Sequence, residues 1–134
     1  ERNKSPKEMK QRWKAILFLV GFAVLYGIIC RKEFESIPMM AVIILHYTAV
    51  SLGEEFTYRK LILGLLNTRY KTWIAVVVNA IMFSFILHIN EDLIANLLIR
   101  FPMGIVLGCI AVKTNTIAYT IVLHTIYNLI VLIL

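Results

Sequence analysis

Two adjacent carboxylates, Glu54 and Glu55, and the guanidinium of Arg59 lie inside an otherwise apolar segment. Ionisable groups at membrane depth are costly, so they are kept mainly where they have a function. In a helix, Glu55 and Arg59 are four residues apart and share a face, so they can form an ion pair. Glu54 lies about 100° round the helix from that pair, so its carboxylate stays free. Acids placed in such different environments can divide into a general base and a structural acid.

Three further polar side chains lie in later apolar segments: His88, His124 and Asn128. His124 and Asn128 are four apart and share a helix face. We expect all three to face Glu54, each other or a water-filled cavity rather than lipid. A carboxylate and a histidine around one water can activate it for attack on a carbonyl. A second histidine and an amide can donate to the oxyanion, a contribution of about 2.7–4 kcal/mol per donor. This set suits peptide hydrolysis without a serine or cysteine nucleophile.

These residues form a pattern that resembles one known family. The pattern joins Glu54-Glu55-x-x-x-Arg59, an apolar run ending in His88, and His124-x-x-x-Asn128. It resembles the signature motifs of the CAAX protease and bacteriocin-processing family, also called the Abi family. The glycine-containing run 101–108 looks like the third motif of that family. The resemblance covers residues 50–134, and its first and last motifs are specific in combination.

One position departs from the family pattern. The family usually has phenylalanine four residues before the motif-two histidine, whereas this chain has Ser84 there, flanked by Phe83 and Phe85. Two interpretations stay open: a neighbouring residue supplies the aromatic ring, or the substrate wall differs. We expect Phe83, Ser84 and Phe85 to border the substrate pocket.

The resemblance implies an intramembrane endopeptidase of the glutamic type. By analogy, Glu54 with His88 activates water, and His124 with Asn128 holds the oxyanion. Glu55 and Arg59 are then the supporting pair. The implied substrate is a membrane-associated peptide or protein, such as a prenylated CAAX protein, a bacteriocin leader or a pro-peptide.

Two alternatives remain open on the residues alone. Glu54, His88 and His124 could together bind zinc with an open position for water. No HExxH or similar ligand spacing supports a metal, so we expect no metal and no cofactor. The protein could also act as a non-cleaving membrane partner, as a bacteriocin-immunity or scaffold protein of the same family. Loss of function on Glu54→Gln would favour the enzyme.

Composition places the chain in a membrane. Of its 134 residues, 60% are hydrophobic, against roughly 45–50% in soluble domains. The formal net charge of +6 is concentrated at the start of the chain, because six of the fourteen Lys and Arg lie within residues 1–14. We interpret residues 1–12 as a basic cytoplasmic arm next to the lipid bilayer. Basic and aromatic residues are not interleaved on a polar face, so a nucleic-acid partner is not expected. The sequence begins at Glu1, which leaves an N-terminal extension open.

Five apolar spans are predicted, at 13–30, 37–66, 72–89, 93–112 and 117–134. Together they predict an all-α, polytopic transmembrane helical bundle, with residues 13–134 as one Abi-type protease domain in the cell membrane. Positive residues in alternate loops place the N-terminus in the cytoplasm. The second span would be about 45 Å long as a straight helix, against a bilayer core of about 30 Å. We therefore expect it to tilt, project or break, with Gly53 as the expected break. The fourth span is expected to kink or break near Pro102, and its Gly104 and Gly108 suit close helix contact.

Overall fold

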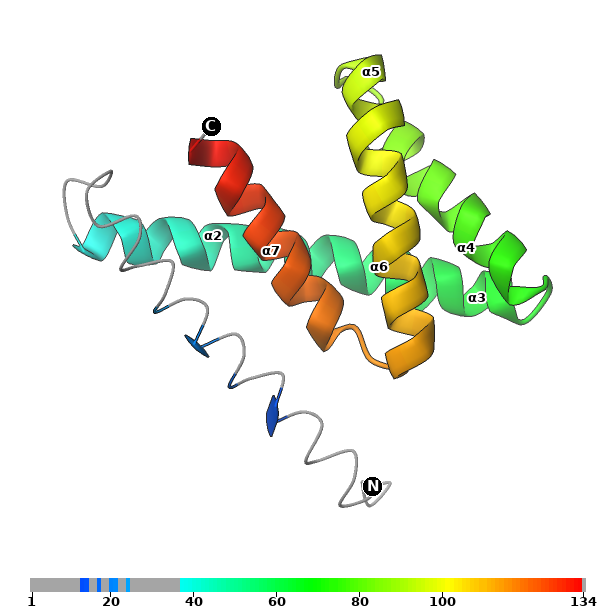
Figure 1. The fold of residues 1–134 in the computed structure, drawn as a ribbon, viewed down its shortest axis with the longest axis horizontal. Coiled ribbons are helices and arrows are strands. Elements are labelled where there is room, and N and C mark those ends of the chain that lie inside the picture. Colours follow the sequence, from blue (N-terminus) through cyan, green and yellow to red (C-terminus); the bar gives the residue numbers. More distant parts are fainter. Residues whose placement is uncertain (1–12, 15–16, 18–19, 22–23, 25–36, 134) are drawn as a thin grey trace.

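The computed structural model describes residues 13–14, 17, 20–21, 24 and 37–133. The predicted arm, residues 1–12, and most of the first predicted span lie outside the described residues. From residue 37 onward the described elements are all helices, as predicted (Figure 1). They are α2 (Ile37–Glu55), η2 (Phe56–Ile62), α3 (Leu63–Asn67), α4 (Thr72–Ile81), η3 (Met82–Leu87), α5 (Leu93–Ala95), η4 (Asn96–Arg100), α6 (Phe101–Thr114) and α7 (Ala118–Ile133), where η marks a π-helical segment.

The second predicted span is one unbroken helix, so the expected break at Gly53 is wrong. The helix runs through α2, η2 and α3, from Pro38 to Asn67, over 30 residues. Gly53 does not take a positive φ, and a helical glycine costs only about 1 kcal/mol relative to alanine. The irregularity lies instead just after the glutamates, where the helix widens into the π-helical segment Phe56–Ile62.

The span near Pro102 is also continuous, from Leu93 to Thr114. The predicted break is absent from this described helix, because Pro102 lies in the first turn of α6, where its missing N–H does least harm. A π-helical segment, Asn96–Arg100, comes directly before that turn. Asn115 then ends α6 in the left-handed conformation, with φ 52°, which asparagine adopts more readily than most residues. This residue turns the chain into α7.

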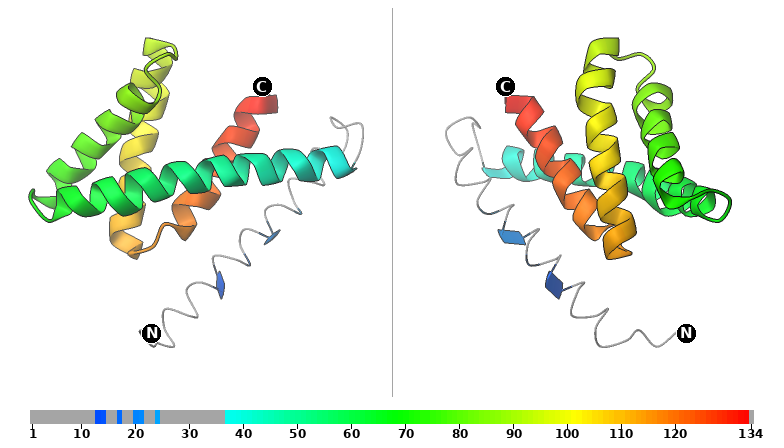
Figure 2. Two further views of the ribbon diagram at one scale, coloured as in Figure 1. Left: turned by 180° about the vertical axis from the view of Figure 1, so that it is seen from behind. Right: turned by 45° about the vertical axis from the view of Figure 1, so that its right-hand side comes forward.

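Two helix pairs form the bundle. α2 packs mainly against α7, and α4 packs mainly against α6. The long helix α2–η2–α3 runs across the other helices (Figures 1 and 2). The predicted close contact at the two α6 glycines is confirmed: a Cβ on Gly104 would lie 3.2 Å from the Ala80 Cα, and a Cβ on Gly108 would lie 3.1 Å from Val76 Cγ1. Because glycine has no side chain at positions 104 and 108, α4 and α6 can pack this closely.

Two described helices are long and apolar enough to cross a bilayer, Pro38–Asn67 and Leu93–Thr114. Two shorter apolar helices, Thr72–Leu87 and Ala118–Leu132, lie beside them. The predicted count of five spans therefore stays a prediction, as does the orientation of the N-terminus. Large apolar side chains are exposed along these helices, as expected where lipid surrounds a bundle. Examples are Val42, Leu45, Leu93, Ile94, Leu97, Leu98 and Val106.

Candidate functional site

Polar side chains join α2 to α7. His124 Nδ1 lies 3.0 Å from Glu55 Oε1. One turn further along α7, Asn128 Nδ2 donates to Ser51 Oγ at 3.2 Å. Because residue numbers fall along α2 as they rise along α7, the two helices run antiparallel. The sequence predicted that His124 and Asn128 share a face. It did not identify Ser51, whose side chain is fully buried in the same contact.

His124 lies between the two glutamates. Its Nδ1 atom faces Glu55, and its Nε2 atom lies 3.5 Å from Glu54 Oε2. The two carboxylates differ in burial, because the Glu54 side chain is 22% exposed and that of Glu55 is 0% exposed. The free glutamate predicted by helix geometry is therefore not isolated. It reaches the histidine of another helix, and it is the less buried of the two.

Arg59 pairs with Glu55, as the four-residue spacing predicted. Its Nε atom lies 3.3 Å from Glu55 Oε2, and both side chains are fully buried. The guanidinium also donates from Nη1 to Asn79 Oδ1 at 3.2 Å. Asn79 in turn donates to the Tyr58 carbonyl at 2.8 Å. Sequence reasoning missed Asn79, although an amide at the centre of the apolar run Thr72–Leu87 is the kind of signal that marks a polar contact.

Phe83 forms the aromatic centre of the site. Its ring lies edge-on to Tyr58, His88 and His124, with centroid distances of 5.5, 5.3 and 5.6 Å. The Arg59 guanidinium lies 4.5 Å from the ring centroid, close enough for a cation–π interaction. The ring therefore connects both histidines to the buried ion pair.

A π-helical turn explains why Phe83 rather than residue 84 occupies this place. Phe83 lies in the π-helical segment Met82–Leu87, and His88 directly follows it. Hydrogen bonds in a π-helix join residues five apart rather than four, so Phe83 shares a face with His88. The neighbour thus supplies the aromatic ring missing at Ser84. Ser84 is buried and donates to the Ala80 carbonyl at 2.6 Å, and Phe85 is half-buried.

The backbone of His88 is held from the following helix. Its carbonyl accepts hydrogen bonds from Asn96 Nδ2 at 2.8 Å and from the Glu91 N–H at 3.0 Å. Asn96 Oδ1 accepts from Arg100 Nη1 at 2.9 Å, and Arg100 also lies 3.5 Å from Glu91. These contacts supply Arg100 with the partners that its place in an apolar span requires. Asn96 is a second amide that sequence reasoning missed.

All three π-helical segments of the described chain border this cluster. η2 follows Glu55 directly, η3 ends at His88, and η4 carries Asn96 and Arg100. π-Helical turns are rare and are found frequently at functional sites. Each such turn rotates the residues beyond it relative to an α-helix, so it changes which side chains face the centre of the bundle.

Within the part of the chain that the structure describes, no three His, Cys, Asp or Glu side chains are grouped so that they could hold a metal ion. The site brings Glu54, Glu55 and His124 into direct contact, joins Asn128 to Ser51, and links His88 to His124 through the Phe83 ring. The arrangement offers a partly exposed carboxylate in contact with a histidine on a second helix. Such a set can activate water and stabilise an oxyanion.

Comparison with known families identifies the family of the chain. A family model described as type II CAAX prenyl endopeptidase Rce1-like matches residues 36–130. The match spans every site residue named above. Comparisons with curated proteins and with solved structures found no match. Because the family model covers most of the chain, the chain belongs to the Rce1-like family of type II CAAX prenyl endopeptidases.

Proposed function

We propose that this chain is an intramembrane endopeptidase in which Glu54 activates water to hydrolyse a peptide bond. Membership of the family supports a membrane-embedded protease of CAAX type. The assignment of roles to Glu54 and Glu55 rests on one observation, the unequal burial of their side chains around His124. Glu54 is 22% exposed and Glu55 is 0% exposed. Because only Glu54 is partly exposed, we assign it as the general base and Glu55 as its support.

The reaction then needs one group that accepts a proton from water and two hydrogen-bond donors for the oxyanion. Glu54 takes a proton from water while the hydroxide forms a bond to the scissile carbonyl carbon. The carbonyl oxygen becomes an oxyanion, which Asn128 Nδ2 and His124 stabilise by hydrogen bonds. The intermediate collapses, the C–N bond breaks, and Glu54 returns its proton to the leaving amine. His88, placed against the other face of the site by Phe83, holds the attacking water with Glu54.

The charge of the cluster supports His124 as a donor. Glu54 and Glu55 carry two negative charges when ionised, and Arg59 carries one positive charge. A histidine with both ring nitrogens protonated donates from each of them. In that state the four groups sum to zero, and Nδ1–H is held by Glu55. Nε2–H, 3.5 Å from Glu54, is the donor that turns to the oxyanion once Glu54 has taken the proton of the water. Buried charges are stable when they are paired in this way.

The substrate class follows from the family and from the position of the site. A CAAX-type endopeptidase acts on a prenylated or otherwise membrane-associated protein, and the Glu54 carboxylate lies on a helix long enough to span a bilayer. We propose that the substrate is such a protein, cleaved near the membrane. The proposed reaction uses no metal and no cofactor, because Glu54 and His88 together supply the base.

The test is a cleavage assay with the purified chain in lipid nanodiscs and farnesylated CAAX peptides. The proposal expects cleavage that a chelator does not slow, and that Glu54→Gln abolishes. Asp92→Asn is the matched control, because Asp92 is exposed and its side chain accepts from the Ala95 N–H at the start of α5, a cap that asparagine can also make. Cleavage that stops on chelation would establish a metal-bound hydroxide as the nucleophile instead. Full cellular function in the Glu54→Gln variant would overturn the enzyme and leave the non-cleaving membrane partner.

A further inference from the structure

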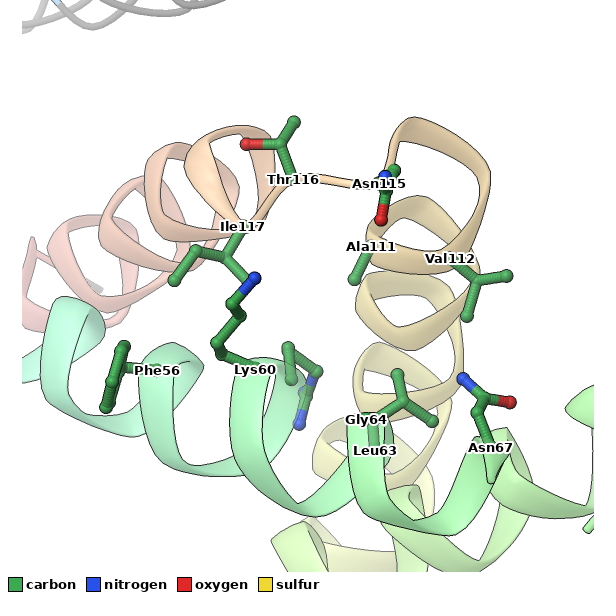
Figure 3. A pocket seen from close by; sticks show the side chains of 11 residues that line it. Phe56, Lys60, Leu63, Gly64, Asn67, Ala111, Val112, Asn115, Thr116 and Ile117 are labelled. Carbon is green, nitrogen blue, oxygen red and sulfur yellow. The ribbon is translucent and has the colours of Figure 1, made fainter. Parts of the chain in front are cut away.

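A polar cavity lies between the long helix and the α6–α7 turn, further toward Asn67 along that helix than the Glu55–His124 contact. Its volume is about 340 Å³. Figure 3 shows Lys60 extending from the long helix toward the turn that carries Asn115 and Thr116, with Asn67 across the cavity. The lining residues come from η2, α3, the end of α6 and the turn. None of them is acidic, and two are cationic, Arg59 and Lys60.

Lys60 is the cation left to face a ligand. The guanidinium of Arg59 is engaged by Glu55, Asn79 and the Phe83 ring. Among the described residues Lys60 forms no ion pair, and its side chain is exposed. The amides of Asn67 and Asn115 likewise make no hydrogen bond to another residue in the described range, and both are exposed. An ammonium and two amides without partners around one cavity suit an anion.

The other walls of the cavity are apolar. Phe56, Leu63, Val112 and Ile117 line it beside the polar groups. A small hydrophilic anion would gain nothing from these walls, whereas an amphiphile would bury apolar surface against them. The cavity also lies at the end of the bundle where Arg69, Lys71 and Lys113 are exposed. A cluster of basic residues at the end of membrane helices attracts anionic lipid headgroups.

We propose that this cavity binds the phosphate headgroup of an anionic phospholipid. Lys60 pairs with the phosphate, Asn67 and Asn115 donate to its oxygens, and the apolar walls contact the glycerol and the first methylenes of the acyl chains. The cavity is separate from Glu54 and His124, so binding does not require a peptidase. Arg59 lines the cavity and also pairs with Glu55, so a bound lipid rests against the residue that supports the proposed catalytic cluster.

The test measures lipid retention by native mass spectrometry of the whole chain, delipidated in neutral detergent and titrated with phosphatidylglycerol or phosphatidylcholine. We expect tighter retention of phosphatidylglycerol. Removing the charge with Lys60→Gln should weaken that retention by about fivefold or more, since one basic residue near anionic lipid is worth about that factor. Lys60→Arg should retain it. Lys71→Gln, at a neighbouring exposed lysine that does not line the cavity, should stay within about twofold of the parent protein, because its charge reaches the bound phosphate only through screening water and salt.

Three outcomes would overturn the proposal. The first is equal retention of the two lipids by the parent protein. The second is an equal loss in Lys60→Gln and Lys71→Gln, which would indicate a diffuse attraction to the basic end of the bundle. The third is full displacement of phosphatidylglycerol by millimolar inorganic phosphate, which would assign the cavity to a free anion. Thermal melting of each variant checks that the fold is unchanged. Because the readout is binding, its failure would leave the proposed peptidase activity untouched.

Discussion

Glu55 joins two helices through its two carboxylate oxygens. Oε1 lies 3.0 Å from His124 Nδ1 on α7, and Oε2 lies 3.3 Å from Arg59 Nε one turn along its own helix. The side chain is fully buried. A buried charge held from two sides in this way positions its partners. The orientation of the His124 ring, with Nε2 toward Glu54, therefore depends on Glu55.

The two glutamates should respond differently to the same substitution. Glu55→Gln leaves Arg59 as a buried charge without its counterion, and loss of one partner of a buried pair costs about 3–5 kcal/mol. Glu54→Gln leaves the buried pair intact, so its melting temperature should stay near that of the parent protein. Thermal melting of both purified variants in the same detergent measures the difference. A Glu55→Gln variant that melts normally and a destabilised Glu54→Gln variant would reverse the two roles.

Asn128 should affect cleavage more than its partner Ser51 does. Removal of one oxyanion donor, as in Asn128→Ala, should lower kcat by about 10²–10³-fold. Ser51→Ala removes the hydroxyl that accepts from Asn128 at 3.2 Å but leaves the donor in place. We expect a smaller loss of kcat with KM little changed. Equal losses in the two variants would indicate that Asn128 only holds α2 against α7.

Asn79 should be important for stability. In Asn79→Ala, Arg59 Nη1 loses its buried acceptor, and the Tyr58 carbonyl keeps only the Leu63 N–H. An unsatisfied buried polar group costs about 1–3 kcal/mol, with larger values for charged groups. Asn90→Ala is the matched control, because Asn90 is exposed in the turn before α5 and should change stability by less than about 0.5 kcal/mol. Chemical or thermal unfolding of the two variants tests the contrast.

The two glycines of α6 should differ in their tolerance of alanine. At Gly104 a Cβ would meet the backbone of α4, at 3.2 Å from the Ala80 Cα. At Gly108 it would meet a Val76 side-chain methyl at 3.1 Å, and a side chain yields more readily than backbone. Overpacking costs about 1–3 kcal/mol, so we expect Gly104→Ala to be the more destabilising. Melting temperatures that fall equally would show that α6 moves as a whole to make room.

Local spacing along one helix was predictable from the sequence. The Glu55–Arg59 pair and the shared face of His124 and Asn128 both follow from residues four apart, and both are present. Contacts between helices were not predictable in the same way. Ser51 meets a residue 77 positions later, and Arg59 meets Asn79 across 20 positions. No periodicity within one segment specifies such partners.

The π-helical turns were the other obstacle. The family pattern placed the aromatic residue at position 84, and the sequence left open whether a neighbour such as Phe83 supplies the ring instead. The length of the second span suggested a break at Gly53, whereas the irregularity of this helix is the π-helical segment after Glu55. A single sequence carries no simple signal for a π-helical turn, because the turn depends on packing by neighbouring helices. Spacing within one helix was therefore more predictable than contacts between helices.

The π-helical register before His88 can be tested by restoring the family pattern. Ser84→Phe places phenylalanine four residues before His88, as the family usually has it. If an α-helical register held, the new ring would face the histidines and stability would rise or stay the same. In the observed register Ser84 is 0% exposed and Phe83 already fills the centre of the site. The larger side chain should then destabilise the protein by about 1–3 kcal/mol or more.

The companion substitution Phe83→Ala should also destabilise, by about 3–5 kcal/mol, because it empties the space between the histidines and Arg59. Phe85→Ala is the control, since Phe85 is only half-buried, and it should cost less.

The double variant with Phe83→Ala and Ser84→Phe separates the two registers most sharply. If it recovers the stability lost in Phe83→Ala, the ring at position 84 can take the same place and the register is α-helical. If it is no more stable than Phe83→Ala alone, the π-helical turn determines which residue faces His88.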